Sequence, residues 1–203
     1  MKTAIQSFAR GLVVLAPLWL SACIDVTNVQ QPASGQANVP FDVQVDVSST
    51  WACEAGSTCT PYVSVSLPAG WVVESCAYAG GVSGTCSASA AYTPSVGPTA
   101  PANAWQTFAG ATITPAADLP AGTTATVTLR IRPSTPGATT LDYVLGADKT
   151  GSQFWGTASM DHPITIQAAA VTAVPTLTTY GYVLMALGLA AVALRQRRKS
   201  KGD

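Results

Sequence analysis

Four cysteines are the residues of this 203-residue chain that are best placed to do chemistry. They are Cys53, Cys59, Cys76 and Cys86, so the spacings within the two successive pairs are six and ten residues. A structural zinc site needs four clustered thiolate or imidazole ligands, usually in pairs with two to four residues between them. The wider spacings favour disulfides in an oxidising compartment. Of the three possible connectivities we expect Cys53–Cys59 and Cys76–Cys86, because each closes a short loop that contains glycine.

The single histidine, His162, is the next candidate because it follows Asp161 directly. Neighbours along a strand point to opposite faces of a sheet, so this adjacency does not make a catalytic pair. The chain has no G-x-S-x-G motif, no phosphate-binding glycine loop and no D-x-D-x-D-G calcium loop. We therefore expect no catalytic residue, no cofactor and no metal, and a protein that is not an enzyme. A loop-built calcium site that uses Asp142, Asp148 or Asp161 is the one alternative left open.

Four tryptophans could bind a ligand instead. They are Trp51, Trp71, Trp105 and Trp155, which fall at the ends of predicted strands or in loops. An exposed indole on a β-sandwich could stack on the sugar rings of an exopolysaccharide. As core residues the same side chains would close the ends of the sandwich and bury a large area each. We favour the core for each of them and keep stacking as the alternative.

The C-terminal thirty residues combine a short motif, an uncharged apolar run and a basic tail. The run extends over 177–194, and at about 1.5 Å per residue a helix there spans roughly 27 Å, close to the hydrocarbon thickness of a thin bilayer. Five lysines or arginines follow within residues 195–201. A basic flank stays cytoplasmic, so we expect a transmembrane helix over 177–194 with the preceding domain outside.

Residues 174–198 resemble the IPTL-CTERM sorting domain of Gram-negative bacteria. That family begins Ile-Pro-Thr-Leu-Ser-x-Trp-Gly, and continues with a transmembrane helix and an arginine-rich tail. Pro175, Thr176, Leu177 and Gly181 match the motif, whereas Val174 stands for Ile, Thr178 for Ser and Tyr180 for Trp. The resemblance implies recognition by an exosortase-type membrane transpeptidase, which removes such tails and passes the protein to the cell surface. It assigns no activity to the domain upstream.

The N-terminus has the pattern of a secretory signal peptide over residues 1–22. A positively charged start precedes an apolar stretch, 11–20, which is too short for a typical spanning helix. The sequence Leu-Ser-Ala-Cys that ends at Cys23 resembles a bacterial lipobox, in which the cysteine is acylated. An ordinary signal-peptidase site is the alternative. The chain has five cysteines, so Cys23 has no disulfide partner if the other four pair with one another. This favours lipidation of Cys23, which would follow export by the Sec machinery.

Residues 24–170 fit one domain between these signals. The range holds nine acidic and three basic residues, which gives a net charge of −6. The net charge of the whole chain is zero because the terminal segments are basic. Such a domain lacks the basic footprint of nucleic-acid binding and would be repelled by anionic lipid. Its membrane contact should therefore come from the terminal segments, 1–22 and 174–203.

Alternating apolar and polar residues predict β-strands throughout this domain. Strands are expected at 41–48, 63–67, 71–78, 107–114, 125–132, 141–145, 154–159 and 164–166. Residues 87–104, rich in Ala, Ser, Thr and Pro, are expected to form a long flexible loop. About seven to nine short strands with turns between them predict an all-β fold, a β-sandwich.

Residues 119–146 resemble the closing hairpin of bacterial immunoglobulin-like surface modules. A glycine-containing turn, a Thr/Val strand, Pro-x-x-Pro-Gly and another alternating strand carry this resemblance. It implies an immunoglobulin-like β-sandwich and no ligand.

Together these patterns predict an exported, non-enzymatic cell-surface or extracellular-matrix protein. Its precursor would be anchored in the inner membrane by the C-terminal helix, and the protein would then be displayed at the surface or secreted. The alternative is a carbohydrate-binding surface module that takes exopolysaccharide. A secreted hydrolase is a third class, with the least support from the sequence.

Overall fold

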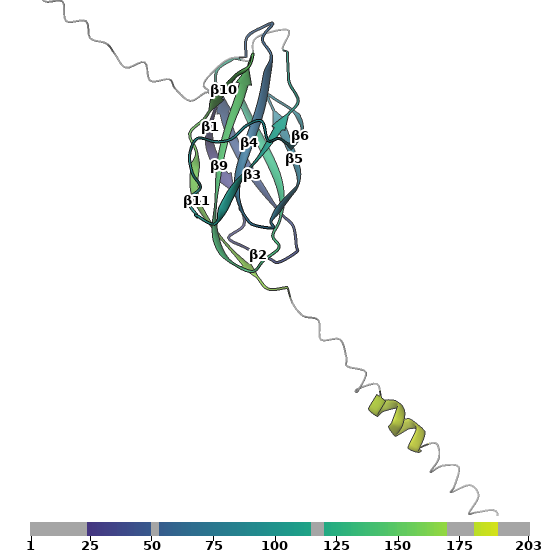
Figure 1. Ribbon diagram of the computed structural model, residues 1–203. Coiled ribbons are helices and arrows are strands. Elements are labelled where there is room, and N and C mark those ends of the chain that lie inside the picture. The colour runs from purple at the N-terminus through teal and green to yellow at the C-terminus, as the bar shows by residue number, and fades with distance from the viewer. Residues whose placement is uncertain (1–23, 50–52, 115–119, 170–180, 191–203) are drawn as a thin grey trace, which may run out of the picture. The chain divides into compact units, whose positions relative to one another are not determined.

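The structure, a computed structural model, describes residues 24–49, 53–114, 120–169 and 181–190 (Figure 1). The chain divides into two compact units, one ending at Ala168 and the other beginning at Ala169. The first unit is a β domain, and residues 181–190 of the second form a helix.

The described part of the β domain contains eleven strands. They are β1 (Ile24–Gln30), β2 (Ser34–Gln36), β3 (Phe41–Ser49), β4 (Cys59–Pro68), β5 (Val72–Gly80), β6 (Gly84–Ala88), β7 (Asn103–Gly110), β8 (Thr124–Arg132), β9 (Gly137–Lys149), β10 (Ser152–Trp155) and β11 (Ser159–Gln167). The predicted all-β fold is confirmed. Strands β1, β2 and β6 lack a clear apolar alternation, and the sequence does not predict them.

The strands form one curled sheet in the order β1-β3-β8-β5-β6-β7-β4-β9-β11-β2, with β10 paired to β9. All pairs are antiparallel except β2 with β11. We call β1, β3, β8 and β5 the first layer, and β7, β4, β9 and β11 the second layer. Strand β6 pairs with both β5 and β7, so the curl of the sheet passes through it.

One hydrophobic core lies between the two layers. The first layer contributes Val43, Val45, Val127, Leu129 and Ile131, and the second contributes Val63, Val65, Leu141, Tyr143 and Leu145. In β3 and β8 these residues alternate with exposed or half-buried polar ones, as expected of a sheet with one solvated face. Each fully buried Val, Leu or Ile side chain contributes about 1.5–3 kcal/mol to stability.

The two central strands of the second layer, β4 and β9, are buried on both faces. Consecutive residues of β4 and β9 are buried, including polar ones such as Ser64, Ser66 and Asp142. Gly146 allows one part of this packing, because a Cβ atom there would overlap the ring of Tyr62. Something must therefore cover the outer face of β4 and β9.

The expected hairpin over residues 119–146 is not formed. β8 pairs with β3 and β5 in the first layer, whereas β9 pairs with β4, β10 and β11 in the second. The link that contains Pro133 therefore crosses from one layer to the other. Both strands turn their alternate apolar residues toward the same core, so the sequence pattern alone does not separate a hairpin from this crossover.

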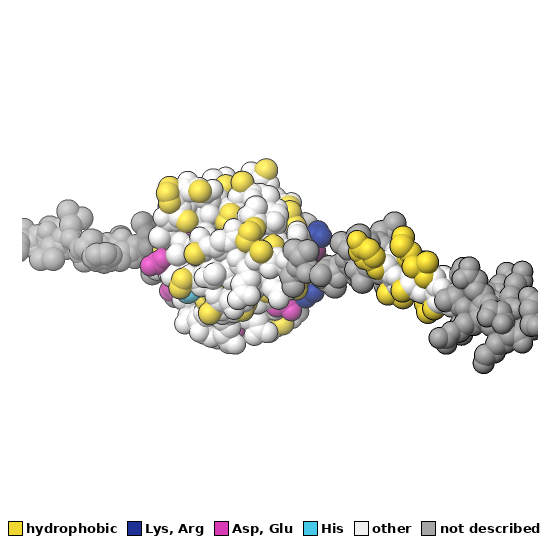
Figure 2. Space-filling view, turned by 90° about the horizontal axis from the view of Figure 1, so that it is seen from below, with side chains coloured by type: hydrophobic (Ala, Val, Ile, Leu, Met, Phe, Trp, Pro, Cys, Tyr) yellow, Lys and Arg dark blue, Asp and Glu magenta, His cyan; other side chains and the backbone are white. Residues whose placement is uncertain are grey.

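The described helix of the second unit is short and apolar. It covers residues 181–190, and the large apolar side chains from Tyr182 to Leu189 are exposed on its surface (Figure 2). Within the described ranges of the chain, no helix is long and apolar enough to cross a membrane. The ends of the expected span, 177–180 and 191–194, lie outside those ranges.

Candidate functional site

Several residues singled out from the sequence lie outside the described residues. They are Cys23, Trp51 and the motif residues Val174, Pro175, Thr176, Leu177 and Tyr180. Gly181, the last residue of the motif, is exposed at the start of the described helix. The sorting motif and the acylation of Cys23 therefore stay predictions.

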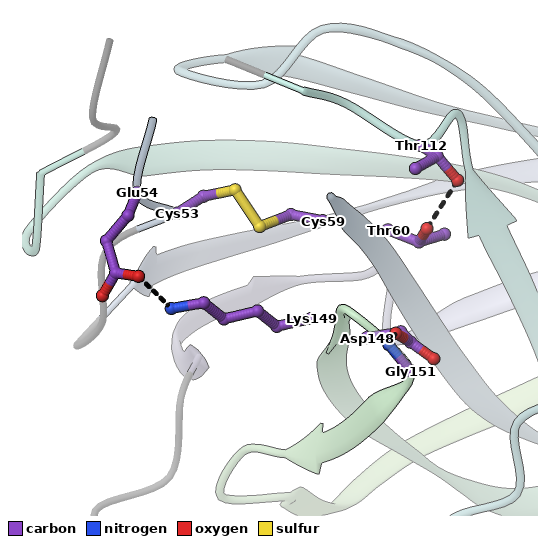
Figure 3. Close-up of a disulfide and its surroundings, with 8 residues drawn as sticks. All are labelled: Cys53, Glu54, Cys59, Thr60, Thr112, Asp148, Lys149 and Gly151. Atoms are coloured by element: carbon purple, nitrogen blue, oxygen red, sulfur yellow. Dashed lines mark hydrogen bonds and ion pairs between the residues drawn. A yellow bond between two sulfur atoms is a disulfide. The ribbon is translucent and has the colours of Figure 1, made fainter. Parts of the chain in front are cut away.

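The four remaining cysteines form the two expected disulfides. The Cα atoms of Cys53 and Cys59 are 6.3 Å apart, and those of Cys76 and Cys86 are 5.1 Å apart, both within the usual range for a disulfide. The first bridge ties the start of β4 to the preceding loop (Figure 3). The second joins β5 to β6, at the curl of the sheet. Because all four sulfurs are paired, they cannot serve as thiolate ligands of a zinc ion.

An ion pair lies beside the first bridge. Lys149 Nζ of β9 is 2.8 Å from Oε2 of Glu54, and Glu54 is the residue that follows Cys53 in the chain (Figure 3). Nearby, Asp148 Oδ1 accepts a hydrogen bond from the Gly151 N–H in the turn before β10. Asp148 therefore has a local role in this turn. In the described part of the chain, no group of three or more His, Cys, Asp or Glu side chains is arranged to hold a metal ion.

Trp71 is a core residue. Its side chain is buried, its ring meets Phe41 edge-on at 6.3 Å between centroids, and its indole N–H donates to Thr135 Oγ1 at 3.3 Å. This burial removes Trp71 from the candidates for sugar stacking. The physical reason is that the residue lies just before β5, where its large ring fills the core between the layers.

Trp105 and Trp155 lie on the outer face of the second layer and are half-buried. The Trp105 indole N–H donates to the carbonyl of Val96 at 2.7 Å. The ring of Trp155 lies 4.5 Å from that of Tyr62, which in turn stacks on Tyr92 at 4.3 Å. Each indole is therefore partly packed against the protein and partly exposed to solvent.

The segment that covers this outer face is residues 89–102, which we call the strap. No strand forms within it, as predicted for a loop, but it is tied to the sheet along its length. The Ser89 N–H donates to the Thr107 carbonyl at 2.8 Å, and the Gln153 side chain donates to the Ala91 carbonyl at 3.2 Å. These contacts, together with those of Tyr92 and Val96, correct the expectation of a loose loop. They also explain why β4 and β9 are buried on both faces.

Asp142 is the most unusual residue under the strap. Its side chain is fully buried, and no basic residue of the described chain forms an ion pair with it. Its carboxylate accepts hydrogen bonds from the Thr99 N–H and hydroxyl, both at 2.7 Å, from the Asp161 N–H at 2.8 Å and from the Ser66 hydroxyl at 3.0 Å. Burial alone would raise the pKa of Asp142, but these four hydrogen bonds outweigh it and hold the pKa below its usual range.

The Asp142 carboxylate therefore joins three parts of the domain. Thr99 belongs to the strap, Ser66 to β4 and Asp161 to β11, whose backbone there has the left-handed φ of 67°. With its oxygens engaged in this way, the carboxylate is occupied by structural contacts. The sequence places Asp142 in an expected strand, 141–145, and gives no sign that a loop covers it.

His162 is half-buried at the irregular part of β11. Its Nε2 lies 2.9 Å from the Ser159 hydroxyl oxygen, and its ring meets Tyr143 edge-on at 5.5 Å. Burial lowers the pKa of His162, while the charges of Asp142 and Asp161 act in the opposite direction. Among the described residues no hydrogen bond reaches Nδ1, so the Ser159–His162 pair lacks the third group that orients the histidine of a hydrolase triad.

Comparison with known proteins assigns no family. No family model and no curated protein matches the chain. Among solved structures, the cohesin module from a family 33 glycoside hydrolase of Clostridium perfringens is 8% identical, with 73% of this chain and 100% of that chain covered and a TM-score of 0.41. The C-terminal domain of the AgI/II polypeptide BspA from Streptococcus agalactiae is 8% identical, with 68% and 48% covered and a TM-score of 0.39. The corresponding domain of AspA from Streptococcus pyogenes is 10% identical, with 72% and 46% covered and a TM-score of 0.39. These similarities are too low to carry a functional argument.

Proposed function

We propose that this protein is exported and displayed at the cell surface or in the extracellular matrix, where its β domain acts by binding or assembly and not by catalysis. The two disulfides, Cys53–Cys59 and Cys76–Cys86, are the observation that carries this proposal. Disulfides form and persist in oxidising compartments and are rare in the cytosol. The signal-peptide pattern over residues 1–22 gives the route of export.

The β domain would be an immunoglobulin-like β-sandwich. Two layers of mainly antiparallel strands that share one core are consistent with this family of folds. A non-enzymatic role fits the two groups that come nearest to chemistry in the described domain. Asp142 has its oxygens engaged by structural hydrogen bonds, and His162 has a serine partner but no orienting group on Nδ1.

The C-terminal segment would direct the last stage of export. We propose that an exosortase-type membrane transpeptidase recognises the motif over 174–181 after a helix over 177–194 has entered the inner membrane. The described helix carries large apolar side chains, among them Leu184, Leu187 and Leu189, on its surface, and such a surface supports insertion in lipid.

Topology is tested by two fusions of alkaline phosphatase, which is active only outside the cytoplasm. A fusion after Ala170 should be active, and a fusion after Asp203 should be inactive in the precursor, because the basic tail stays inside. Equal activity of the two fusions would contradict the proposed orientation.

Processing is tested by the intact mass of the protein extracted from the surface. The mass of the wild-type protein should show that the basic tail, up to and including Lys201, has been removed. The Pro175→Ala variant should retain this tail. Thr179→Ala is the matched control, because Thr179 occupies the unspecified position of the motif. Wild-type protein that keeps its tail in a host with an exosortase would mean that the segment is a plain anchor.

A carbohydrate-binding role is the second candidate, favoured by the half-exposed Trp105 and Trp155 on one outer face. In a pull-down with the host's own exopolysaccharide, Trp105→Ala and Trp155→Ala should each weaken retention if the indoles stack on sugar rings. Val72→Ala is the control, because Val72 is exposed on the first layer. Equal retention of all variants would remove this candidate.

A further inference from the structure

A groove lies on the outer face of the first layer, away from the core. Strands β1, β3, β8 and β5 all contribute to it, and its lining includes Thr27, Asp46, Ala79, Gly80, Thr124 and Thr126. The volume of the groove is about 250 Å³. A cavity of roughly 150 Å³ accepts benzene, so the groove has room for a group the size of a side chain.

Small residues at the end of β5 leave this space. Ala79 pairs with Thr126 of β8, and Gly80 pairs with Ala125. Gly80 has a φ of 114°, and a Cβ atom there would lie 2.9 Å from the Thr124 carbonyl oxygen. Only glycine fits such a position, so the wall of the groove stays low here.

Asp46 of β3 is the charged residue among those that line the groove. Its side chain is half-buried. No lysine or arginine of the described chain forms an ion pair with it, because Arg130 and Arg132 of the same layer pair with other carboxylates. The negative charge of Asp46 is therefore not balanced by a cation from the described residues.

Hydrogen bonds hold the Asp46 carboxylate in one orientation. Asn28 Nδ2 donates to Oδ2 at 3.0 Å, and the Thr126 hydroxyl donates to Oδ1 at 2.7 Å. These bonds, with a smaller contribution from Gln30, lower the pKa of Asp46, so the group is charged at neutral pH. A carboxylate has about four acceptor positions, so it can still accept a hydrogen bond from a ligand.

The neighbouring hydroxyls can also accept from a ligand. The Thr27 hydroxyl donates its proton to the backbone carbonyl of Asp46 at 3.0 Å, and the Thr126 hydroxyl donates its proton to the carboxylate. Both hydroxyl oxygens keep lone pairs, and the carboxylate has no proton to give. A ligand that fits this set must therefore supply donors and a positive charge. A primary ammonium has three donors and no acceptor.

We propose that this groove binds a primary ammonium group on a short aliphatic stem, with the ammonium at Asp46 and the hydroxyls of Thr27 and Thr126, and with the stem over Ala79 and Gly80. The net charge of −6 over residues 24–170 attracts such a cation. The lysine side chain of a partner protein and a free aliphatic amine share this chemistry.

The experiment uses the full-length chain, with ¹³C-labelled alanine and threonine methyl groups, in nanodiscs of zwitterionic phosphatidylcholine. Butylammonium is titrated at pH 7, well below the pKa of about 10.4 of such an amine, while the methyl signals of Ala79 and Thr126 are followed. It should give saturable shifts. Butanol has the same stem without the charge, and butyltrimethylammonium has the charge without N–H donors. Each should bind roughly tenfold more weakly or worse, because each loses hydrogen bonds to a charged group.

Two variants test the carboxylate. Asp46→Asn removes the charge with little change of shape and should weaken the binding of butylammonium roughly tenfold or more. Asp42→Asn is the matched control, because Asp42 is an exposed carboxylate of the same strand that pairs with Arg130 and does not line the groove. It should leave the binding within about twofold.

A second pair of variants leaves Asp46 in place. Ala79→Leu should fill the groove and abolish the shift at Thr126. Ala77→Leu is its control, because Ala77 is exposed on the same strand and does not line the groove. Equal binding of butanol and butylammonium would overturn the proposal. So would the absence of a saturable shift in wild type, or binding that neither Asp46→Asn nor Ala79→Leu weakens.

The source of the ammonium is distinguished with Nα-acetyl-lysine amide, which carries the group on a lysine side chain. Binding within about fivefold of that of butylammonium would assign the groove to a lysine of a partner protein. Weaker binding would assign it to a free amine, and the ammonium site is supported in both cases. The proposal does not depend on export or sorting of the chain.

Discussion

The Asp142 carboxylate accepts two hydrogen bonds from Thr99, one from the backbone N–H and one from the hydroxyl, each at 2.7 Å. The two residues are 43 positions apart and belong to different parts of the domain, the strap and β9. This pair fixes a segment without secondary structure over the outer face of the second layer. It does so with a buried negative charge, which is costly unless all its oxygens are satisfied.

Asp142→Asn should therefore destabilise the domain and loosen the strap. The new amide group places an N–H where a carboxylate oxygen accepted one, so at least one donor from Thr99, Asp161 or Ser66 loses its acceptor. We expect a loss of about 2–3 kcal/mol in the free energy of unfolding, measured by urea denaturation. Amide exchange at Thr99 should accelerate as well.

Asp148→Asn is the control for this substitution, because Asp148 accepts one hydrogen bond in an exposed turn. It should cost less than about 1 kcal/mol. A similar small effect of Asp142→Asn, with unchanged exchange at Thr99, would show that other contacts of the strap hold it in place without the Asp142 carboxylate.

We also expect the Asp142 carboxylate to make the stability of the domain depend on pH. The pKa of Asp142 in the folded protein lies below its ordinary value, so the folded state binds this proton less readily than the unfolded state does. The contribution to stability is complete above the unfolded pKa of about 4 and is lost as the pH falls through the lower folded pKa.

Hydrogen bonds from Asn28 and Thr126 also lower the pKa of Asp46, so wild type alone cannot assign the effect. The difference between wild type and Asp142→Asn isolates the contribution of Asp142. We expect this difference in the free energy of unfolding to shrink as the pH falls below about 4. A difference that stays constant down to pH 2 would contradict a lowered pKa.

The titration of His162 should make stability depend on pH in a second range, at higher pH than that of Asp142. Burial lowers its pKa in the folded state, despite the opposite effect of Asp142 and Asp161, so the unfolded chain takes up the proton first as the pH falls. Stability should decrease below the unfolded pKa of about 6.5. His162→Phe keeps a ring against Tyr143 and removes the titration. Urea denaturation at pH 7 and pH 5.5 should show a smaller change for the variant, and equal changes would exclude His162 as the cause.

The all-β fold and the pairing of the cysteines could be predicted from the sequence because both are local signals. Val43, Val45 and Val47 alternate with polar residues along one strand, and each disulfide closes a short loop. The crossover between β8 and β9 could not be predicted, since a strand that faces a core has the same alternation whichever neighbours it pairs with.

The roles of Asp142 and Tyr78 depend on contacts between distant segments. Nothing in the sequence around Asp142 indicates that Thr99 will cover it. The alternation around Tyr78 gives no hint that its hydroxyl has no hydrogen-bond partner among the described residues. The environment of Asp142 depends on where the strap lies. The environment of Tyr78 depends on how the two layers pack together. Such features appear only when the tertiary structure is known.

The two disulfides should contribute to stability through the unfolded chain. A bridge that closes a loop of about ten residues stabilises a domain by roughly 2–3 kcal/mol in the chain-entropy model. Cys76→Ser with Cys86→Ser removes the bridge that joins β5 to β6, at the point where the sheet curls from one layer to the other. We expect this double variant to lose about 2–3 kcal/mol in urea denaturation and to show faster amide exchange in β6 than in β3.

Cys53→Ser with Cys59→Ser is the matched comparison, because its loop is shorter, six residues against ten, and lies outside the curl. Its loss should be slightly smaller, and exchange in β6 should stay as in wild type. Alkylation of the non-reduced wild-type protein should label none of the four cysteines. If instead all four are labelled without reductant, the bridges do not form in the cell, and the argument for an oxidising compartment fails with them.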